Sequence, residues 1–169
     1  MKNYVCKIAN FEEMNAKWDY QISIAKNKDN WKIWKKENID MYNDGYIIPY
    51  YGVLDGVIIC EATAYITSKS VSCVHDCKNL IGNGTVYLSA FRTNKEYQGK
   101  GYFSKLFKYM ISDLKLKGYK KATLGVEPDE IRNKEIYMHY GFNEHIKDAI
   151  ESYPDGTKIV VEYYGKSLI

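Results

Sequence analysis

The sequence predicts an α/β (α+β) protein with a mixed, mostly antiparallel sheet of about seven strands flanked by about four helices. Short apolar segments recur along the 169 residues and alternate with longer segments of helical periodicity. Asp55-Gly56 separates two strand-like segments, which is a strong signal for a two-residue hairpin turn. The apolar positions within 103–114 follow the 3.6-residue period and trace one face of a helix.

The N-terminal half is predicted to begin with a strand and two helices and to continue with a hairpin. Asn10 precedes Glu13 by three residues, as at a capped helix start. We expect a strand at 5–9, helices at 11–25 and 31–41, and strands at 46–54 and 57–66.

The C-terminal half follows a loop at 68–84, which is polar and contains a Gly-Asn-Gly turn. Gly118 is expected to stop the long helix, and Gly141 a shorter one. The predicted elements are a strand at 85–93, a helix from 101, a strand at 119–126, a helix at 129–140, and strands at 143–152 and 158–164.

Length and composition predict one domain spanning 1–169. The 24 basic and 21 acidic residues give a net charge of +3, too small to indicate a nucleic-acid partner. No apolar stretch reaches the roughly 20 residues of a membrane helix, and the first residues do not resemble a signal peptide. We therefore expect a cytoplasmic protein with no membrane partner and with reduced cysteines.

The segment Gln98-Gly99-Lys100-Gly101 joins a predicted strand to a predicted helix. The N–H groups at a helix start and the helix dipole favour a bound diphosphate, and glycines let the backbone approach it closely. The P-loop string is absent, and Ser104 stands where the dinucleotide fingerprint requires its last glycine. Taken alone, the segment is compatible with an anion site or with a simple turn.

Two motifs together resemble those of the GNAT acetyltransferases. The run Asn94-Lys95-Glu96-Tyr97-Gln98-Gly99-Lys100-Gly101-Tyr102-Phe103 resembles the acetyl-CoA motif Arg/Gln-x-x-Gly-x-Gly/Ala of that family. Tyr137-Met138-His139-Tyr140-Gly141-Phe142 resembles its Tyr-x-x-x-Gly-Phe signature. The resemblance covers about 85–142 and implies the GNAT fold with acetyl-CoA as the acyl donor.

The resemblance also implies roles for individual residues. Backbone groups at the end of the central strand would pair with the pantetheine arm, and the following loop and helix start would hold the diphosphate. Tyr137 would donate a proton to the leaving thiolate, and Glu127 or Glu61 would act as the general base. The predicted cofactor-binding residues are Phe91, Arg92, Thr93, Gln98, Gly99, Lys100, Gly101, Tyr102, Phe103 and Ser104.

The sequence departs from the family pattern at two positions. Phe103 replaces the small residue that closes the acetyl-CoA motif, which implies different packing of the helix there. Glu130 stands where the family often has an asparagine that contacts the cofactor arm, and Asn133 lies nearby but out of register.

We expect the acceptor to be the primary amine of a small molecule: a polyamine, an amino sugar or aminoglycoside, or an amino acid. A protein N-terminus or lysine, and a non-catalytic acyl-CoA sensor, are the alternatives. A homodimer is possible within the family. Cys73-Val74-His75-Asp76-Cys77 holds ligand-type residues without a second pair, so no metal site is expected. The tryptophans at 18, 31 and 34 are expected in the core, or partly in the acceptor pocket.

Overall fold

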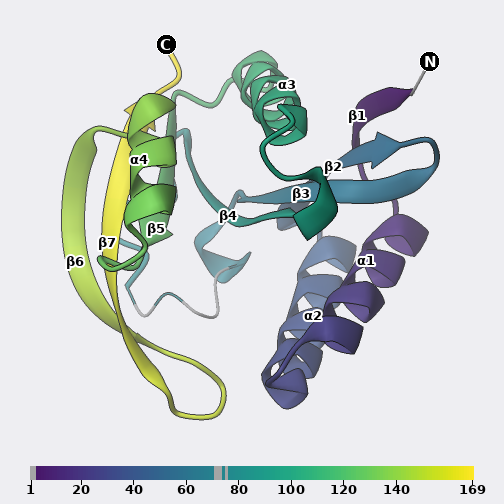
Figure 1. Cartoon of the computed structure of the whole chain (residues 1–169). Coiled ribbons are helices and arrows are strands. Elements are labelled where there is room, and N and C mark those ends of the chain that lie inside the picture. Colours follow the sequence, from purple (N-terminus) through teal and green to yellow (C-terminus); the bar gives the residue numbers. More distant parts are fainter. Residues whose placement is uncertain (1–2, 71–73, 75) are drawn as a thin grey trace.

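The computed structural model describes residues 3–70, 74 and 76–169 (Figure 1). A seven-stranded sheet has the order β1-β2-β3-β4-β5-β7-β6, in which only β4 and β5 are parallel. The strands are β1 (Tyr4–Ile8), β2 (Ile47–Leu54), β3 (Val57–Tyr65), β4 (Thr85–Thr93), β5 (Lys121–Val126), β6 (Glu144–Ser152) and β7 (Lys158–Ser167). The helices are α1 (Phe11–Ile24), α2 (Lys28–Asn43), α3 (Tyr102–Leu116) and α4 (Ile131–His139), with 3₁₀ turns at Ser68–Ser70 and Lys95–Tyr97. The predicted fold class is confirmed.

Local signals in the sequence account for several element boundaries. Asn10 accepts from the Glu13 N–H at 2.9 Å while the Glu13 carboxylate accepts from the Asn10 N–H, a complete capping box at the start of α1. Asp55 and Gly56 both have positive φ, as a type I′ hairpin turn requires. Two helix starts differ from the prediction: α2 begins three residues earlier, at Lys28, and α4 begins at Ile131 after the turn at 127–130.

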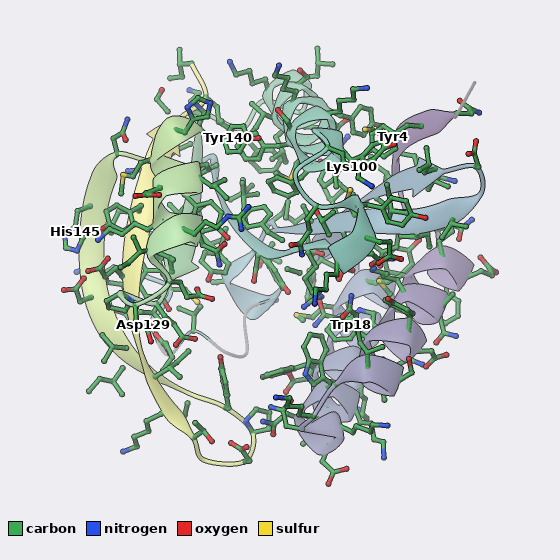
Figure 2. All side chains as sticks on the ribbon, viewed as in Figure 1. Tyr4, Trp18, Lys100, Asp129, Tyr140 and His145 are labelled. Atoms are coloured by element: carbon green, nitrogen blue, oxygen red, sulfur yellow. The ribbon has the colours of Figure 1, made fainter. Side chains whose placement is uncertain are left out.

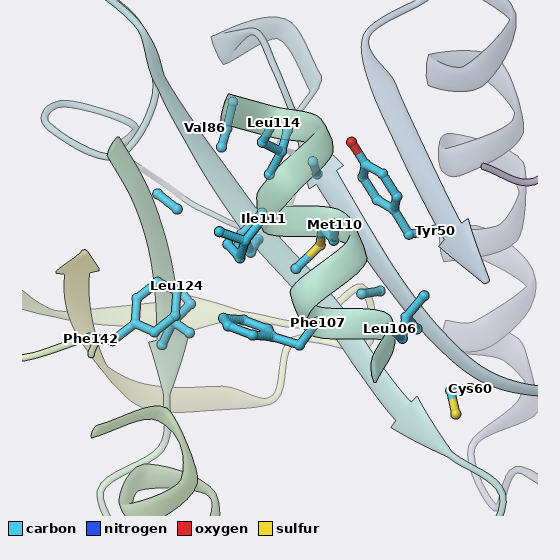
Figure 3. Packing of buried hydrophobic residues seen from close by; sticks show 14 of the residues in the cluster. Tyr50, Cys60, Val86, Leu106, Phe107, Met110, Ile111, Leu114, Leu124 and Phe142 are labelled. Carbon is cyan, nitrogen blue, oxygen red and sulfur yellow. The ribbon is translucent and has the colours of Figure 1, made fainter. Parts of the chain in front are cut away.

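Helix α3 covers one face of the sheet and confirms the predicted apolar stripe. Its inward residues pack on β-strand side chains such as Val86 and Leu124, with Phe142 completing the cluster (Figure 3). The buried positions of the helix are Leu106, Phe107, Met110, Ile111 and Leu114. Helix α4 lies on the same face, because its Tyr137, Met138 and following Tyr140 pack against this cluster.

Helices α1 and α2 cover the opposite face of β2 and β3, where they pack against each other (Figure 1). Met14 and Trp18 of α1 and Met41 of α2 are buried there against Tyr51 and Tyr87 of the sheet. Within the described residues, no helix combines the length and apolar composition needed to cross a membrane.

The first strand is tied to the start of α3 through Tyr4. The Tyr4 hydroxyl donates to the carbonyl of Tyr102 at 2.8 Å, and its ring lies 4.8 Å from the Tyr102 ring. The phenol occupies the space above Gly52 of β2, where any Cβ would overlap it. The absence of a side chain at Gly52 therefore leaves room for Tyr4 to hold the beginning of α3.

We predict that Gly52→Ala lowers the free energy of unfolding by about 1–3 kcal/mol, the usual cost of overpacking. In a double-mutant cycle with Tyr4→Ala, the double variant should lose less unfolding free energy than the two single variants lose in total, because removing the phenol removes the overlap. Urea unfolding of the four proteins measures this. Strict additivity would show that Tyr4 does not occupy the space above Gly52.

Candidate active site

A bulge in β4 determines which side chains face which side of the sheet. Between its pairs with Thr63 and Glu61 of β3, β4 advances three residues, from Ser89 to Arg92, while β3 advances two. The extra residue is accommodated at Ala90, whose φ is +58°. Because strand side chains alternate, one inserted residue exchanges the two faces beyond it.

Because of this exchange, odd-numbered residues of β4 face α3 beyond the bulge, whereas even-numbered residues face it before the bulge. Val86 and Leu88 point into the core under α3, and beyond the bulge Phe91 packs against that same core. Arg92 instead lies over the Trp18 and Trp31 rings of α1 and α2. The bulge therefore places neighbouring residues on opposite sides of the sheet.

Strands β4 and β5 separate at the same place. Their parallel ladder runs from Thr85 opposite Lys121 to Leu88 opposite Leu124 and ends there. Beyond it, β4 pairs only with β3 and β5 only with β7, and Figure 1 shows the two strands diverging. The β5-facing edge of β4 after Leu88 is thus open to a ligand that carries its own amide groups.

A cavity of about 690 Å³ lies beside this open edge, between the start of α3 and one side of α4. Its size is typical of cofactor and small-molecule sites. Eight of the ten predicted cofactor-binding residues line it: Phe91, Thr93, Gln98, Gly99, Gly101, Tyr102, Phe103 and Ser104.

The backbone at the start of α3 forms a cradle of unpaired donors. In the described chain, the N–H groups of residues 99–104 donate to no protein acceptor, and α3 has no side-chain cap. Gly99 and Gly101 have φ of +71° and +80°, a region that residues with a Cβ rarely adopt. Because unpaired N–H groups meet the positive end of the helix dipole here, the cradle suits a diphosphate.

Two of the predicted residues do not line the cavity. The Lys100 ammonium donates to the carbonyl of Glu96 at 2.7 Å, within its own loop. The Arg92 side chain is on the other face of the sheet, so only its backbone can take part in cofactor binding. Gln98 lines the cavity and also donates to the carbonyl of Thr93 at 3.0 Å, which fastens the loop to the end of β4.

Tyr137 lines the cavity beside Phe91. Its ring is 5.5 Å from that of Phe91, which in turn lies 5.6 Å from the ring of Phe103. Burial, together with the nearby charge of Glu130, raises the pKa of the Tyr137 phenol above its usual value. The phenol thus stays protonated at neutral pH and can donate a hydrogen bond beside the open edge of β4.

Part of the cavity wall, on α4, was not predicted from the sequence. The side chains at 132, 133, 136, 137 and 140 share one helical face, so helical spacing from Tyr137 could have found them. Asn133 lines the cavity, whereas Glu130, at the family's asparagine position, does not. The additional lining residues are Tyr97, Arg132, Asn133, Glu135, Ile136, His139 and Tyr140.

The two predicted bases have different surroundings. Glu61 is 3% exposed and forms an ion pair with the Arg92 guanidinium. Glu127 is half-buried at the end of β5, where it accepts from the Tyr153 hydroxyl at 3.4 Å. Burial, followed by the charges of Glu130 and Asp129, raises the pKa of the Glu127 carboxyl. Neither carboxylate lines the cavity; of the two, Glu127 is not held in an ion pair within the described chain and is the better able to exchange a proton.

The β6–β7 hairpin reaches α2 on the face opposite α3. The Tyr153 ring packs edge-on against Trp34 with centroids 5.2 Å apart. The Asn30 amide donates to the Asp155 carboxylate at 3.0 Å. The Asn30–Asp155 contact joins residues 125 positions apart, and together the two contacts cover one side of the region next to Glu127.

The possible metal cluster at 73–77 lies partly outside the described residues, because Cys73 and His75 are among those not described. Among the residues that are described, no group of three or more His, Cys, Asp or Glu side chains is arranged to hold a metal ion.

Comparisons with known proteins agree with this geometry. The profile of the Acetyltransferase (GNAT) family matches residues 11–142. The chain belongs to the GNAT acetyltransferase family. It is an acyltransferase by that membership, and acetyl-CoA is the family's acyl donor. A search of curated proteins gives no match.

Solved structures share the fold of this GNAT protein at low sequence identity. An N-acetyltransferase from Staphylococcus aureus Mu50 is 16% identical, with a TM-score of 0.67 over 99% of both chains. The ribosomal-protein-S18-alanine N-acetyltransferase of Escherichia coli is 12% identical, with a TM-score of 0.71 over 98% of this chain and 94% of that one. A Salmonella typhimurium protein described as an acetyltransferase, solved with acetyl-CoA, is 16% identical, with a TM-score of 0.65 over 99% and 95%.

We predict that Gly101→Ala weakens CoA binding about tenfold or more, because a Cβ disfavours the left-handed φ that directs the cradle N–H groups. Isothermal titration calorimetry with CoA measures the effect. Gly118→Ala is the matched control. Gly118 has φ +88°, lies at the opposite end of α3, and has open space where the Cβ of the alanine would lie. Equal CoA affinities in the two variants would show that the cradle does not hold the diphosphate.

Proposed function

We propose that the protein transfers the acetyl group of acetyl-CoA to the primary amine of a small molecule by direct attack. One observation carries this proposal: the N–H cradle, the open edge of β4 and Tyr137 all border a single cavity. The first two fit the diphosphate and the pantetheine amides of CoA, whose thioester supplies the acyl group.

In this mechanism Tyr137 stabilises the leaving thiolate. An ordinary phenol with a pKa of about 10 is a weaker acid than a thiol at about 8.5, so full proton transfer to a thiolate is uphill. The raised pKa of Tyr137 makes the transfer harder still. We therefore modify the expected role: the phenol acts chiefly by donating a hydrogen bond as negative charge develops on sulfur.

Glu127 serves as the general base, through a water molecule where the acceptor amine is too distant for direct contact. An amine must lose a proton to attack, and a carboxylate with a raised pKa is a stronger base than an ordinary one. Asp129 and Glu130 add negative charge beside it, which also attracts a cationic amine. Glu61, held by Arg92, is assigned no proton transfer.

The contacts of the β6–β7 hairpin support a small acceptor over a protein segment. Tyr153 and Asp155 bridge to α2 across the face from which the amine must approach. An extended peptide needs a groove open at both ends, and these contacts would have to break to admit one.

We predict that Tyr137→Phe lowers kcat by about 10²–10³-fold, because the hydrogen bond to the leaving sulfur is made mainly in the transition state. The KM for acetyl-CoA should change less than threefold. Thiol release with a panel of amines measures both constants. An unchanged kcat would remove Tyr137 from the mechanism.

We predict that Glu127 sets an acidic limb in the pH profile of kcat at saturating amine. The base acts as the carboxylate, so activity is present above its pKa and is lost as pH falls through it. Because that pKa is raised, the limb should lie above the ordinary glutamate value of about 4.3.

Two variants test the assignment of this limb. Glu127→Gln should abolish it and lower kcat about 10²-fold. Asp129→Asn, which removes one of the charges that raise the pKa, should move the limb to lower pH and keep the plateau rate. A limb that persists in Glu127→Gln belongs to another group.

A further inference from the structure

A row of polar side chains, with an ion pair at its centre, crosses the sheet on the face opposite the cavity. Tyr51 of β2, Glu61 of β3 and Arg92 of β4 stand directly across from one another. The Arg92 guanidinium bonds Glu61 through Nε and lies 4.8 Å from the Trp31 ring and 5.4 Å from the Trp18 ring. Figure 2 shows Trp18 on α1 and Tyr140 on α4 to either side of β4.

The two terminal amino groups of Arg92 have no acceptor among the described residues. A guanidinium offers five N–H donors, and within the described chain only Nε forms a hydrogen bond. The side chain is 27% exposed, so these groups remain accessible. The Glu61 pair and the two indoles fix the guanidinium in one orientation, while its two terminal amino groups, here called the fork, stay free.

The surroundings of the fork carry excess positive charge. Lys17 is 2% exposed, and its ammonium donates to Asn94 at 2.7 Å beside the same ion pair. Glu61 is the main counter-charge to these cations, and Glu96 acts more weakly on Lys17. Burying a cation is costly without a counter-charge, so a second anion would be favourable here.

Arg92 is also next to the reaction. It lies between Phe91 and Thr93, both of which line the cofactor cavity, but its own side chain is on the other face. An amine that reaches the thioester through the gap between β4 and β5 comes from that face. The rest of the acceptor would then lie against Trp31 and Arg92.

We propose that the free fork of Arg92 binds a carboxylate of the acceptor, which makes the substrate an amino acid. This proposal rests on the proposed function and selects among its acceptor classes. The amine would point toward the gap and Glu127, and the carboxylate toward Arg92, in the bidentate geometry that guanidinium and carboxylate favour. A polyamine would bring a second cation against Arg92 and Lys17, a like-charge contact that disfavours it, and a simple amino sugar would leave the guanidinium without a counter-charge.

The test compares each L-amino acid with its own carboxamide, alongside spermidine and glucosamine, by thiol release from acetyl-CoA. The best amino acid should exceed its carboxamide at least tenfold in kcat/KM. Arg92→Lys, which keeps the charge but loses the fork, should reduce this ratio to below threefold. Lys35→Gln, a cation on α2 paired with the exposed Asp19, is the matched control and should keep the wild-type ratio.

Arg92→Lys can also weaken the protein by loosening its hold on Glu61, so a second variant and a binding measurement are included. Glu61→Gln/Arg92→Gln replaces the ion pair by two amides. Calorimetry of the CoA complex with the N-acetyl form of the best amino acid should show at least tenfold weaker binding to this variant, with CoA affinity retained.

The outcomes separate this inference from the proposed function. Acetylation of amines with no preference for carboxylates, or an equal loss for acid and carboxamide in Arg92→Lys, overturns the carboxylate site and leaves the transferase intact. No acetylation of any amine by a protein that binds CoA overturns the proposed function and the inference with it.

Discussion

The active site depends on one extra residue in β4. Without the bulge at Ala90, Phe91 would face α1 and α2, and Arg92 would point into the cofactor cavity. An alanine at φ +58° has a backbone cost of roughly 1–2 kcal/mol. The surrounding pairs repay it: Phe91 packs between Phe103 and Tyr137, and Arg92 reaches Glu61. The strained conformation persists because both faces fit only with this register.

The same bulge explains what the sequence could and could not predict about the fold. Capping residues, hairpin turns and helical periodicity are local, and they located every strand and helix to within a few residues. Ala90 carries no such signal, because alanine is ordinary in any strand. The exchange of faces follows from pairing with Thr63 and Glu61, about 30 positions away, and only the folded sheet specifies that register.

The two halves of the candidate site differ in predictability for a related reason. The cradle is built from consecutive residues at one loop and one helix start, so a short motif contains most of it. The proposed acceptor side is assembled from α1, α2, β3, β4 and the β6–β7 hairpin, with contacts such as Asn30 to Asp155. The sequence indicated Glu61, Arg92 and the tryptophans separately, but not that they meet, and for Arg92 it predicted only a backbone role at the cofactor.

This difference between the two halves of the site also fits the low sequence identity between the chain and each of the related structures. Backbone N–H groups and an open strand edge can bind a diphosphate and amides whatever most of the side chains are. The fold that presents them is accordingly shared by structures that are only 12–16% identical in sequence. In the carboxylate site proposed above, the acceptor is bound by side chains such as Arg92 against its two indoles, and these can change without disturbing the cradle. Fold and donor therefore follow from family membership. The acceptor has to be argued from the charges on the opposite face, where a fixed guanidinium has donors to spare.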